Sequence, residues 1–282
     1  MLFSLAPIEK RAEDEAMTLQ SATANAELCR GGPSRLAGSS VYCLKGSLDS
    51  TSAESFSELA SDISVLVVDS YGGNTRATMR IARLIYDNDI DVIIEGQCFS
   101  SCANYILPAA SGRLTVLPGS FIGLHGSPPR DHFRFVESYL SQQGLSKEDI
   151  RTDPNLYFGI VAKFANHIEN EIIPEVEFFA HVLVPETYLT RFTAISRAAH
   201  ELEDEICSPK RGVMLVVGPS YLEAVRIRTR YFWWPENTDQ IFNVIGDYKS
   251  DYSVIVDGDS YLSWSLGTGA LQPGQCSFGE HL

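Results

Sequence analysis

Residues 94–112 read Ile-Glu-Gly-Gln-Cys-Phe-Ser-Ser-Cys-Ala-Asn-Tyr-Ile-Leu-Pro-Ala-Ala-Ser-Gly, and the rest of the predicted fold is organised around this stretch. A β-branched run at 92–94 enters it and predicts a buried strand, while the apolar residues at 103–107 predict a helix. The passage between them carries two adjacent serines, Ser100 and Ser101. A serine at such a turn lies where the first backbone N–H groups of a helix are unpaired. That position suits a nucleophile, and it suits an ordinary helix cap equally well.

The same alternation of strand and helix extends outward on both sides. Strands are expected at 41–44, 63–69, 90–95, 114–117 and 121–124, and helices at 52–61 (with Ser52 as its cap), 75–88 and 101–110. This order predicts an α/β fold of repeated ββα or βαβ units. We expect four segments, namely an N-terminal arm at 1–40, the α/β core at 41–127, a helical insertion at 128–207, and strands and loops at 208–282 that complete the core and form a tail.

Charge and hydropathy exclude several classes of partner. The chain has 22 Lys and Arg against 36 Asp and Glu, a net charge of −14, and shows no basic block. Nucleic acid and anionic membrane surfaces are therefore not expected partners. No apolar run approaches the roughly 20 residues that a membrane-spanning helix needs. No signal peptide is visible, so we expect the sequence to be a mature form if the protein is exported.

The six cysteines lie at positions 29, 43, 98, 102, 207 and 276. Two pairs, Cys29 with Cys43 and Cys207 with Cys276, lie in flanks rich in Gly, Ser and Pro, where disulfides are useful, so we expect an oxidising compartment. Cys98 and Cys102 have three readings: a disulfide across the serine turn, two small buried thiols, or a Cys-Cys-His metal site with His125. The metal site lacks a fourth ligand, so neither a metal nor another cofactor is expected.

Three short segments at the carboxyl ends of predicted strands carry the chemistry. They are Gly72-Gly73, the pair Ser100 and Ser101, and His125. Ligand sites of α/β sheets lie at this edge, so we expect the three segments to converge. A neutral imidazole can take the proton of a serine near pH 7, and backbone N–H groups beside glycine can stabilise an oxyanion. Together these are the parts needed for acyl transfer at a serine.

Three motifs in this order resemble the ClpP/crotonase superfamily, and within it the Clp protease proteolytic subunit and related periplasmic serine-protease-like proteins. Residues 69–73, Asp-Ser-Tyr-Gly-Gly, are similar to the family's Asn-Ser-Pro-Gly-Gly turn. Residues 96–104 align without a gap on its nucleophile segment, and residues 122–125 match its histidine strand, with 25 residues separating Ser100 from His125. The resemblance implies that Ser100 is the nucleophile, His125 the base, and the N–H groups of Gly72, Gly73 and Ser101 the oxyanion hole. Sliding the alignment by one residue would make Ser101 the nucleophile instead.

The resemblance further implies a periplasmic or secreted serine peptidase with a peptide or protein substrate. Members assemble into rings or stacked discs, which makes a homo-oligomer an expected partner state.

The chain also departs from the family pattern. Tyr71 stands where the family has a proline. The position of the family's triad Asp falls at about Arg230 in this chain. The triad acid would then be another carboxylate, such as Glu236 or Asp239, or the site would be a Ser-His dyad. These departures favour the alternative of a catalytically inactive ClpP-like binding or scaffolding protein.

Two other reactions within this superfamily rank lower. A serine–lysine mechanism would use Lys147 or Lys163, neither of which lies in a matching motif. A crotonase-type acyl-CoA reaction ranks lowest, because it would need a carboxylate near the oxyanion hole.

Overall fold

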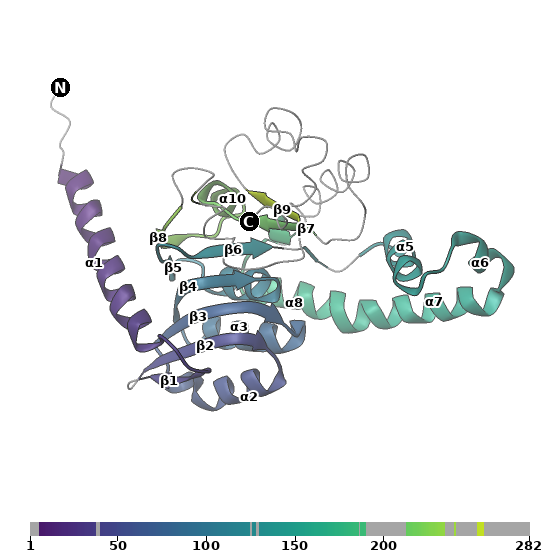
Figure 1. Cartoon of the computed structure of the whole chain (residues 1–282), viewed down its shortest axis with the longest axis horizontal. Coiled ribbons are helices and arrows are strands. Elements are labelled where there is room, and N and C mark those ends of the chain that lie inside the picture. The colour runs from purple at the N-terminus through teal and green to yellow at the C-terminus, as the bar shows by residue number, and fades with distance from the viewer. Residues whose placement is uncertain are drawn as a thin grey trace, which may run out of the picture.

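The chain folds as a mixed α/β structure in which helices cover a multi-stranded sheet (Figure 1). This computed structural model describes residues 6–37, 40–124, 126–127, 130–185, 187–189, 213–234, 240 and 253–256. The predicted α/β class is confirmed.

The elements follow the predicted alternation closely up to residue 124. The strands are β1 (Arg35–Ala37), β2 (Val41–Leu48), β3 (Val65–Gly73), β4 (Asp91–Phe99), β5 (Leu114–Val116), β6 (Phe121–Leu124), β7 (Val213–Val216), β8 (Thr229–Phe232) and β9 (Ser253–Val256). The helices are α1 (Ala6–Leu28), α2 (Ser50–Leu59), η1 (Ala60–Asp62), α3 (Thr75–Asp87), η2 (Cys102–Ile106), α4 (Leu107–Ala109), α5 (His132–Gln143), α6 (Lys147–Thr152), α7 (Pro154–His167), η3 (Ile168–Ile172), α8 (Ile173–His181) and α10 (Pro219–Ala224).

The centre of the sheet is parallel, and its strand order places the end of β4 beside the end of β6. Strands β2, β3 and β4 run parallel and adjacent, with β1 antiparallel on the outer side of β2. The first half of β4 pairs with β5, and its last residues, 97–99, pair with 121–123 of β6. The residues after β4 and the residues after β6 therefore emerge together at one edge of the sheet.

The two faces of the sheet are buried in two separate hydrophobic clusters, as the alternation of side chains along each strand requires. Leu44, Leu66, Val68, Val92 and Ile94 face α2, α3 and η2 in the larger cluster. The residues between them, such as Val67 and Ile93, face the opposite side together with residues of α1. Both faces are covered, which is what a parallel sheet with near-continuous apolar strands needs.

Helix α1 is more than a polar arm. Its final turns bury Ala22 and Ala26 against the sheet, and Cys29 just after the helix forms a disulfide with Cys43 of β2, with Cα atoms 5.4 Å apart. The disulfide joins one of the two cysteine pairs for which the sequence suggests that a bond is useful, although the sequence left the pairing itself open. Such a bond is compatible with an oxidising compartment.

Helices α5, α6 and α7 form an arm that extends away from the sheet (Figure 1). Helix α7 continues through η3 into α8, which returns the chain to the core beside α3. Arg76 of α3 anchors this return, because its guanidinium donates to both the backbone oxygen and Oδ1 of Asn170. The helical character predicted for this part of the chain is present at 132–143, 147–152 and 154–181.

Some predicted boundaries are wrong for physical reasons. Helix α2 begins at Ser50 and is capped by Asp49, whose carboxylate accepts from the Ser52 N–H at 2.8 Å, rather than by Ser52. Strands β3 and β4 continue past their predicted ends at 69 and 95, reaching Gly73 and Phe99. Pairing with neighbouring strands continues there across register shifts, so the Gly- and Ser-rich ends stay in the sheet.

Several expectations fall on residues outside the described ranges. They concern His125, Cys207, Cys276, Glu236 and Asp239. Within the described ranges, no helix has the combination of length and apolar character that a membrane crossing requires.

Candidate active site

Ser100 occupies a strained position at the junction of β4 and the following helical turn. Its φ of +58° lies in the left-handed region, which non-glycine residues rarely adopt and which is enriched at functional sites. Two backbone hydrogen bonds hold this conformation, because the Ser100 N–H donates to Gly123 O and its carbonyl accepts from the Asn104 N–H, both at 2.9 Å. The side chain is partly exposed, whereas its neighbours Phe99 and Ser101 are buried.

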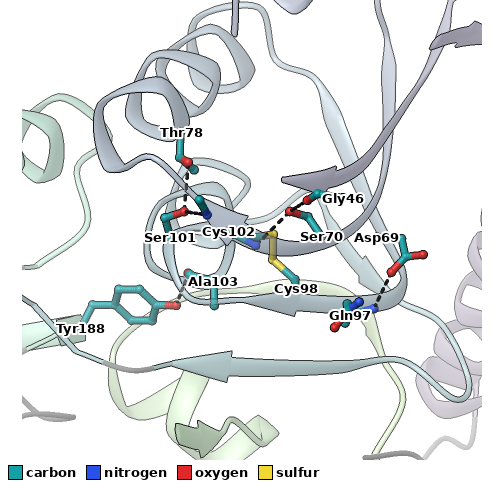
Figure 2. Close-up of a disulfide and its surroundings, with 12 residues drawn as sticks. Gly46, Asp69, Ser70, Thr78, Gln97, Cys98, Ser101, Cys102, Ala103 and Tyr188 are labelled. Carbon is teal, nitrogen blue, oxygen red and sulfur yellow. Dashed lines mark hydrogen bonds between the residues drawn. A yellow bond between two sulfur atoms is a disulfide. The ribbon is translucent and has the colours of Figure 1, made fainter. Parts of the chain in front are cut away.

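A disulfide closes the turn around Ser100. Cys98 at the end of β4 bonds to Cys102 at the start of η2, with Cα atoms 5.3 Å apart (Figure 2). Both cysteines are fully buried. The reading of these residues as free thiols is therefore wrong, and so is the Cys-Cys-His metal site, because the sulfur atoms are consumed in the bond. The bridge ties the two ends of the serine turn to each other.

Gly72 packs directly against this turn. A Cβ at position 72 would lie 2.6 Å from Phe99 O, 2.7 Å from Ser100 Cβ and 3.0 Å from Ser101 N. Its φ of +87° also disfavours any side chain. Only glycine allows the end of β3 to approach the serine so closely, so two of the three predicted segments, Gly72-Gly73 and Ser100, do converge.

Two serine hydroxyls hold the glycine pair. The Gly72 N–H donates to Ser70 Oγ at 3.0 Å, and Ser70 Oγ in turn donates to Gly46 O at 2.6 Å. The Gly73 N–H donates to Ser101 Oγ at 2.9 Å. Of the three N–H groups named for the oxyanion hole, those of Gly72 and Gly73 are therefore hydrogen-bonded within the protein in this structure.

Ser101 is a buried structural residue by its contacts. It is 3% exposed, and its Oγ both accepts from the Gly73 N–H and lies 3.1 Å from Thr78 Oγ1 of α3 (Figure 2). Two partners in a buried site leave this hydroxyl poorly placed to attack a substrate. Of the two adjacent serines, Ser100 is the one that is partly exposed.

The third predicted segment contains His125, which lies outside the described residues, so its position is described by the residues on either side of it. Gly123 accepts the hydrogen bond from Ser100, and Gly126 O accepts one from the buried Asn104 side chain at 3.0 Å. Positions 123 and 126, which flank the histidine in sequence, are thus both bonded to the Ser100 turn. Sequence reasoning missed Asn104, although its position four residues after Ser100 places it on the same helical face.

The turn after Ser100 is an unusual helix. Residues 102–106 form a π-helical turn, a feature often found at functional sites. The hydroxyl of Tyr188 donates to Ala103 O at 2.6 Å within this turn (Figure 2). Burial raises the pKa of the Tyr188 hydroxyl well above its ordinary value, and nearby Tyr221 raises it further, so the hydroxyl remains a donor.

The alternative bases and the triad position lie elsewhere. Lys147 forms an ion pair with Glu137 on the arm, and Lys163 lies over the ring of Tyr139. Arg230, at the position expected for the triad acid, forms an ion pair with Asp91 at the start of β4, at the opposite edge of the sheet from the serine. None of these side chains contributes to the surroundings of Ser100.

Comparison with known proteins gives a single kind of match. No protein-family model matches the sequence, and no curated protein matches it significantly. Among solved structures the chain is similar to a mutant of ClpP1 from Listeria monocytogenes, with 21% identity, 40% of this chain and 77% of that chain covered, and a TM-score of 0.28. What this chain does is therefore inferred from the geometry around Ser100.

Proposed function

We propose that the protein is a serine hydrolase with a ClpP/crotonase-like core, acting on a peptide or protein through an acyl-enzyme on Ser100. The observation that carries the proposal is the left-handed, disulfide-closed turn that presents Ser100 beside Gly72. A nucleophile on a tight strand-to-helix turn is held clear of its own helix, so that a substrate carbonyl can approach it. In the proposed division of the chain, residues 41–127 with 208–282 form the core, and 128–207 form an insertion that shapes the substrate site.

In the proposed reaction, Ser100 Oγ attacks the substrate carbonyl carbon while His125 accepts the serine proton. His125 then returns that proton to the leaving amine, and water hydrolyses the acyl-enzyme. The negative charge on the carbonyl oxygen needs preorganised N–H donors, for which we propose the N–H groups of Gly72, Gly73 and Ser101. The Gly73 N–H becomes available when the Ser101 hydroxyl rotates away from it. No cofactor takes part in this scheme.

The two disulfides support an oxidising compartment, and we propose the periplasm or the extracellular space. A homo-oligomer is the proposed assembly, following the resemblance noted in the sequence.

The test is labelling with a fluorophosphonate, followed by peptide mapping of the adduct. The proposal predicts one stoichiometric adduct on Ser100 in the native, oxidised protein, and none in the Ser100→Ala variant. Heat-denatured protein provides the control for nonspecific reaction. An adduct confined to another residue, or equal labelling of native and denatured protein, would contradict the proposal.

One observation favours the second candidate, a catalytically inactive binding or scaffolding protein. Both glycine N–H groups are occupied by serine oxygens, which leaves the proposed oxyanion hole closed in this structure. Under this alternative neither the wild type nor the Ser101→Ala variant is labelled. Labelling of either protein at Ser100 excludes it.

A further inference from the structure

Glu175 of α8 is a fully buried carboxylate that the proposed reaction does not use directly. Its exposed fraction is 0%, and a charged side chain is almost never buried to that extent without partners. Three donors reach it: Tyr105 Oη at 2.8 Å, Ser127 Oγ at 3.0 Å and an Arg130 guanidinium nitrogen at 2.7 Å. Both carboxylate oxygens are used, since Tyr105 contacts Oε1 and the other two contact Oε2.

The three donors come from the two segments that form the candidate site. Tyr105 lies in η2, the helical turn that begins two residues after Ser100. Ser127 and Arg130 lie in the segment that follows β6, two and five residues after the predicted base at position 125. One carboxylate therefore joins the helical turn of the nucleophile to the segment of the base.

Asn104 provides a second connection between the same two segments. It is 2% exposed, and its amide nitrogen donates to Gly126 O. Its bond fixes one carbonyl of the segment, whereas Glu175 fixes two side chains further along. The position of the segment is thus set from both η2 and α8.

The three donors around position 175 require a negatively charged acceptor there. Arg130 is permanently ionised, and burial, together with the adjacent Glu175 carboxylate, raises the pKa of the Tyr105 hydroxyl, so that it stays protonated. A glutamine at position 175 would turn an NH₂ group toward one of these donors and would remove the ion pair with Arg130. Breaking a buried pair from one side is far more damaging than lacking the pair altogether.

We infer that Glu175 is a positioning residue that holds Ser127 and Arg130 against the η2 turn, and thereby keeps the predicted base aligned with Ser100. This inference rests on the proposed function for its catalytic consequence. A carboxylate that only anchored α8 would affect the stability of the fold and leave the reactivity of the folded protein unchanged. The two roles therefore differ in a measurable way.

The test compares Glu175→Gln with Glu177→Gln, a matched control on the same helix whose side chain is exposed. Labelling of Ser100 is measured against fluorophosphonate concentration, with the folded fraction determined by circular dichroism. For Glu175→Gln we expect the maximal labelling rate to fall roughly ten- to hundredfold, as for a small misplacement of a reacting group. The half-saturating concentration should not change, because Glu175 does not face the reagent. A folded Glu175→Gln variant that labels at the wild-type rate overturns the inference.

If Glu175→Gln does not fold, two milder variants test the positioning role of Glu175. Ser127→Ala and Tyr105→Phe each remove one donor and leave the Glu175–Arg130 pair intact. Both should slow the maximal labelling rate, and wild-type rates in both variants overturn the inference.

Failure of the proposed function is recognised separately, by the absence of labelling in the wild type. In that case hydrogen exchange tests the positioning itself. The backbone amides of Gly126, Arg130 and Asp131 should exchange faster in Ser127→Ala than in Glu177→Gln, and equal rates overturn the inference.

Discussion

At the scale of single residues, the site depends both on the missing side chain of Gly72 and on the hydroxyl of Ser101. Gly72 has no side chain, and this absence lets β3 approach Ser100. The Ser101 hydroxyl contacts the Gly73 N–H and Thr78 Oγ1, and these contacts hold the glycine turn in place. Each of these residues affects Ser100 by a different physical means, and each can be changed alone.

Replacing Gly72 with alanine should damage both stability and labelling. Gly119→Ala is the matched control, because Gly119 has a similar φ of +78° but open space around its would-be Cβ. Both variants carry the cost of a left-handed alanine, and only Gly72→Ala adds the clash with the serine turn. We expect Gly72→Ala to be less stable than Gly119→Ala by about 1–3 kcal/mol in urea unfolding. Equal stability of the two variants would show that the turn tolerates a side chain there.

Ser101→Ala should keep the nucleophile and lose only a structural contact. Removing a buried hydroxyl that satisfies two partners costs about 1–3 kcal/mol of unfolding free energy. Labelling at Ser100 should persist or become faster, because the Gly73 N–H is no longer occupied by the hydroxyl. Loss of the adduct in folded Ser101→Ala would instead identify Ser101 as the nucleophile.

At the scale of elements, the two described disulfides have different structural roles. Cys29–Cys43 connects the end of α1 to β2, far from the serine in sequence, while Cys98–Cys102 spans the serine turn itself. In the chain-entropy description, the stabilisation grows with the length of the closed loop. The sequence separations are 14 and 4 residues, so the outer bond should contribute more to stability.

Replacing each cysteine pair with alanines separates stability from reactivity. Loss of Cys29–Cys43 should cost about 3 kcal/mol, and loss of Cys98–Cys102 about 2 kcal/mol. Only the second change should slow labelling of the folded protein, because only that bond holds the ends of the serine turn. Urea unfolding and labelling rates measure both effects. Equal labelling rates for the two double variants would mean that the inner bond does not shape the site.

At the scale of the whole molecule, buried tyrosines make stability depend on pH in alkaline solution. Burial raises the pKa of Tyr188 above its ordinary value of about 10. The folded state therefore retains a proton that the unfolded state releases, so the free energy of unfolding falls as the pH rises above about 10.

Tyr188→Phe removes this contribution together with one hydrogen bond. We expect the variant to be less stable than the wild type by about 1 kcal/mol at pH 8. The free energies of unfolding of the wild type and the variant, plotted against pH, should converge beyond pH 10, because only the wild type loses the Tyr188 contribution. Parallel curves between pH 8 and 11 would contradict a raised pKa at this residue.

The α/β core was predictable because its signals are local. The buried strand at 65–68 is a continuous apolar run and the helix at 75–87 has a strong helical pattern, and neighbours in the sequence suffice to reveal both signals. The approach of Gly72-Gly73 to Ser100 followed from the rule that parallel strands end at one edge of the sheet.

The missed features depend on contacts between distant residues or on weak local signals. Glu175 looks like one of several glutamates on an exposed helix, and its partner Tyr105 lies 70 residues earlier. The buried half of α1 uses Ala22 and Ala26, whose small side chains give little hydrophobic signal. Asp49 and Ser52 are both good caps, and only the fold decides between them.

The central claim, that His125 activates Ser100, is tested most directly by the pH dependence of the fluorophosphonate labelling rate in wild type and His125→Ala. In the wild type the rate at Ser100 should fall in acidic solution as the imidazole becomes protonated, because a protonated imidazole cannot accept the serine proton. In folded His125→Ala the rate should drop by at least about a hundredfold at pH 7.5 and lose this dependence. An unchanged rate and pH profile in His125→Ala would contradict the account.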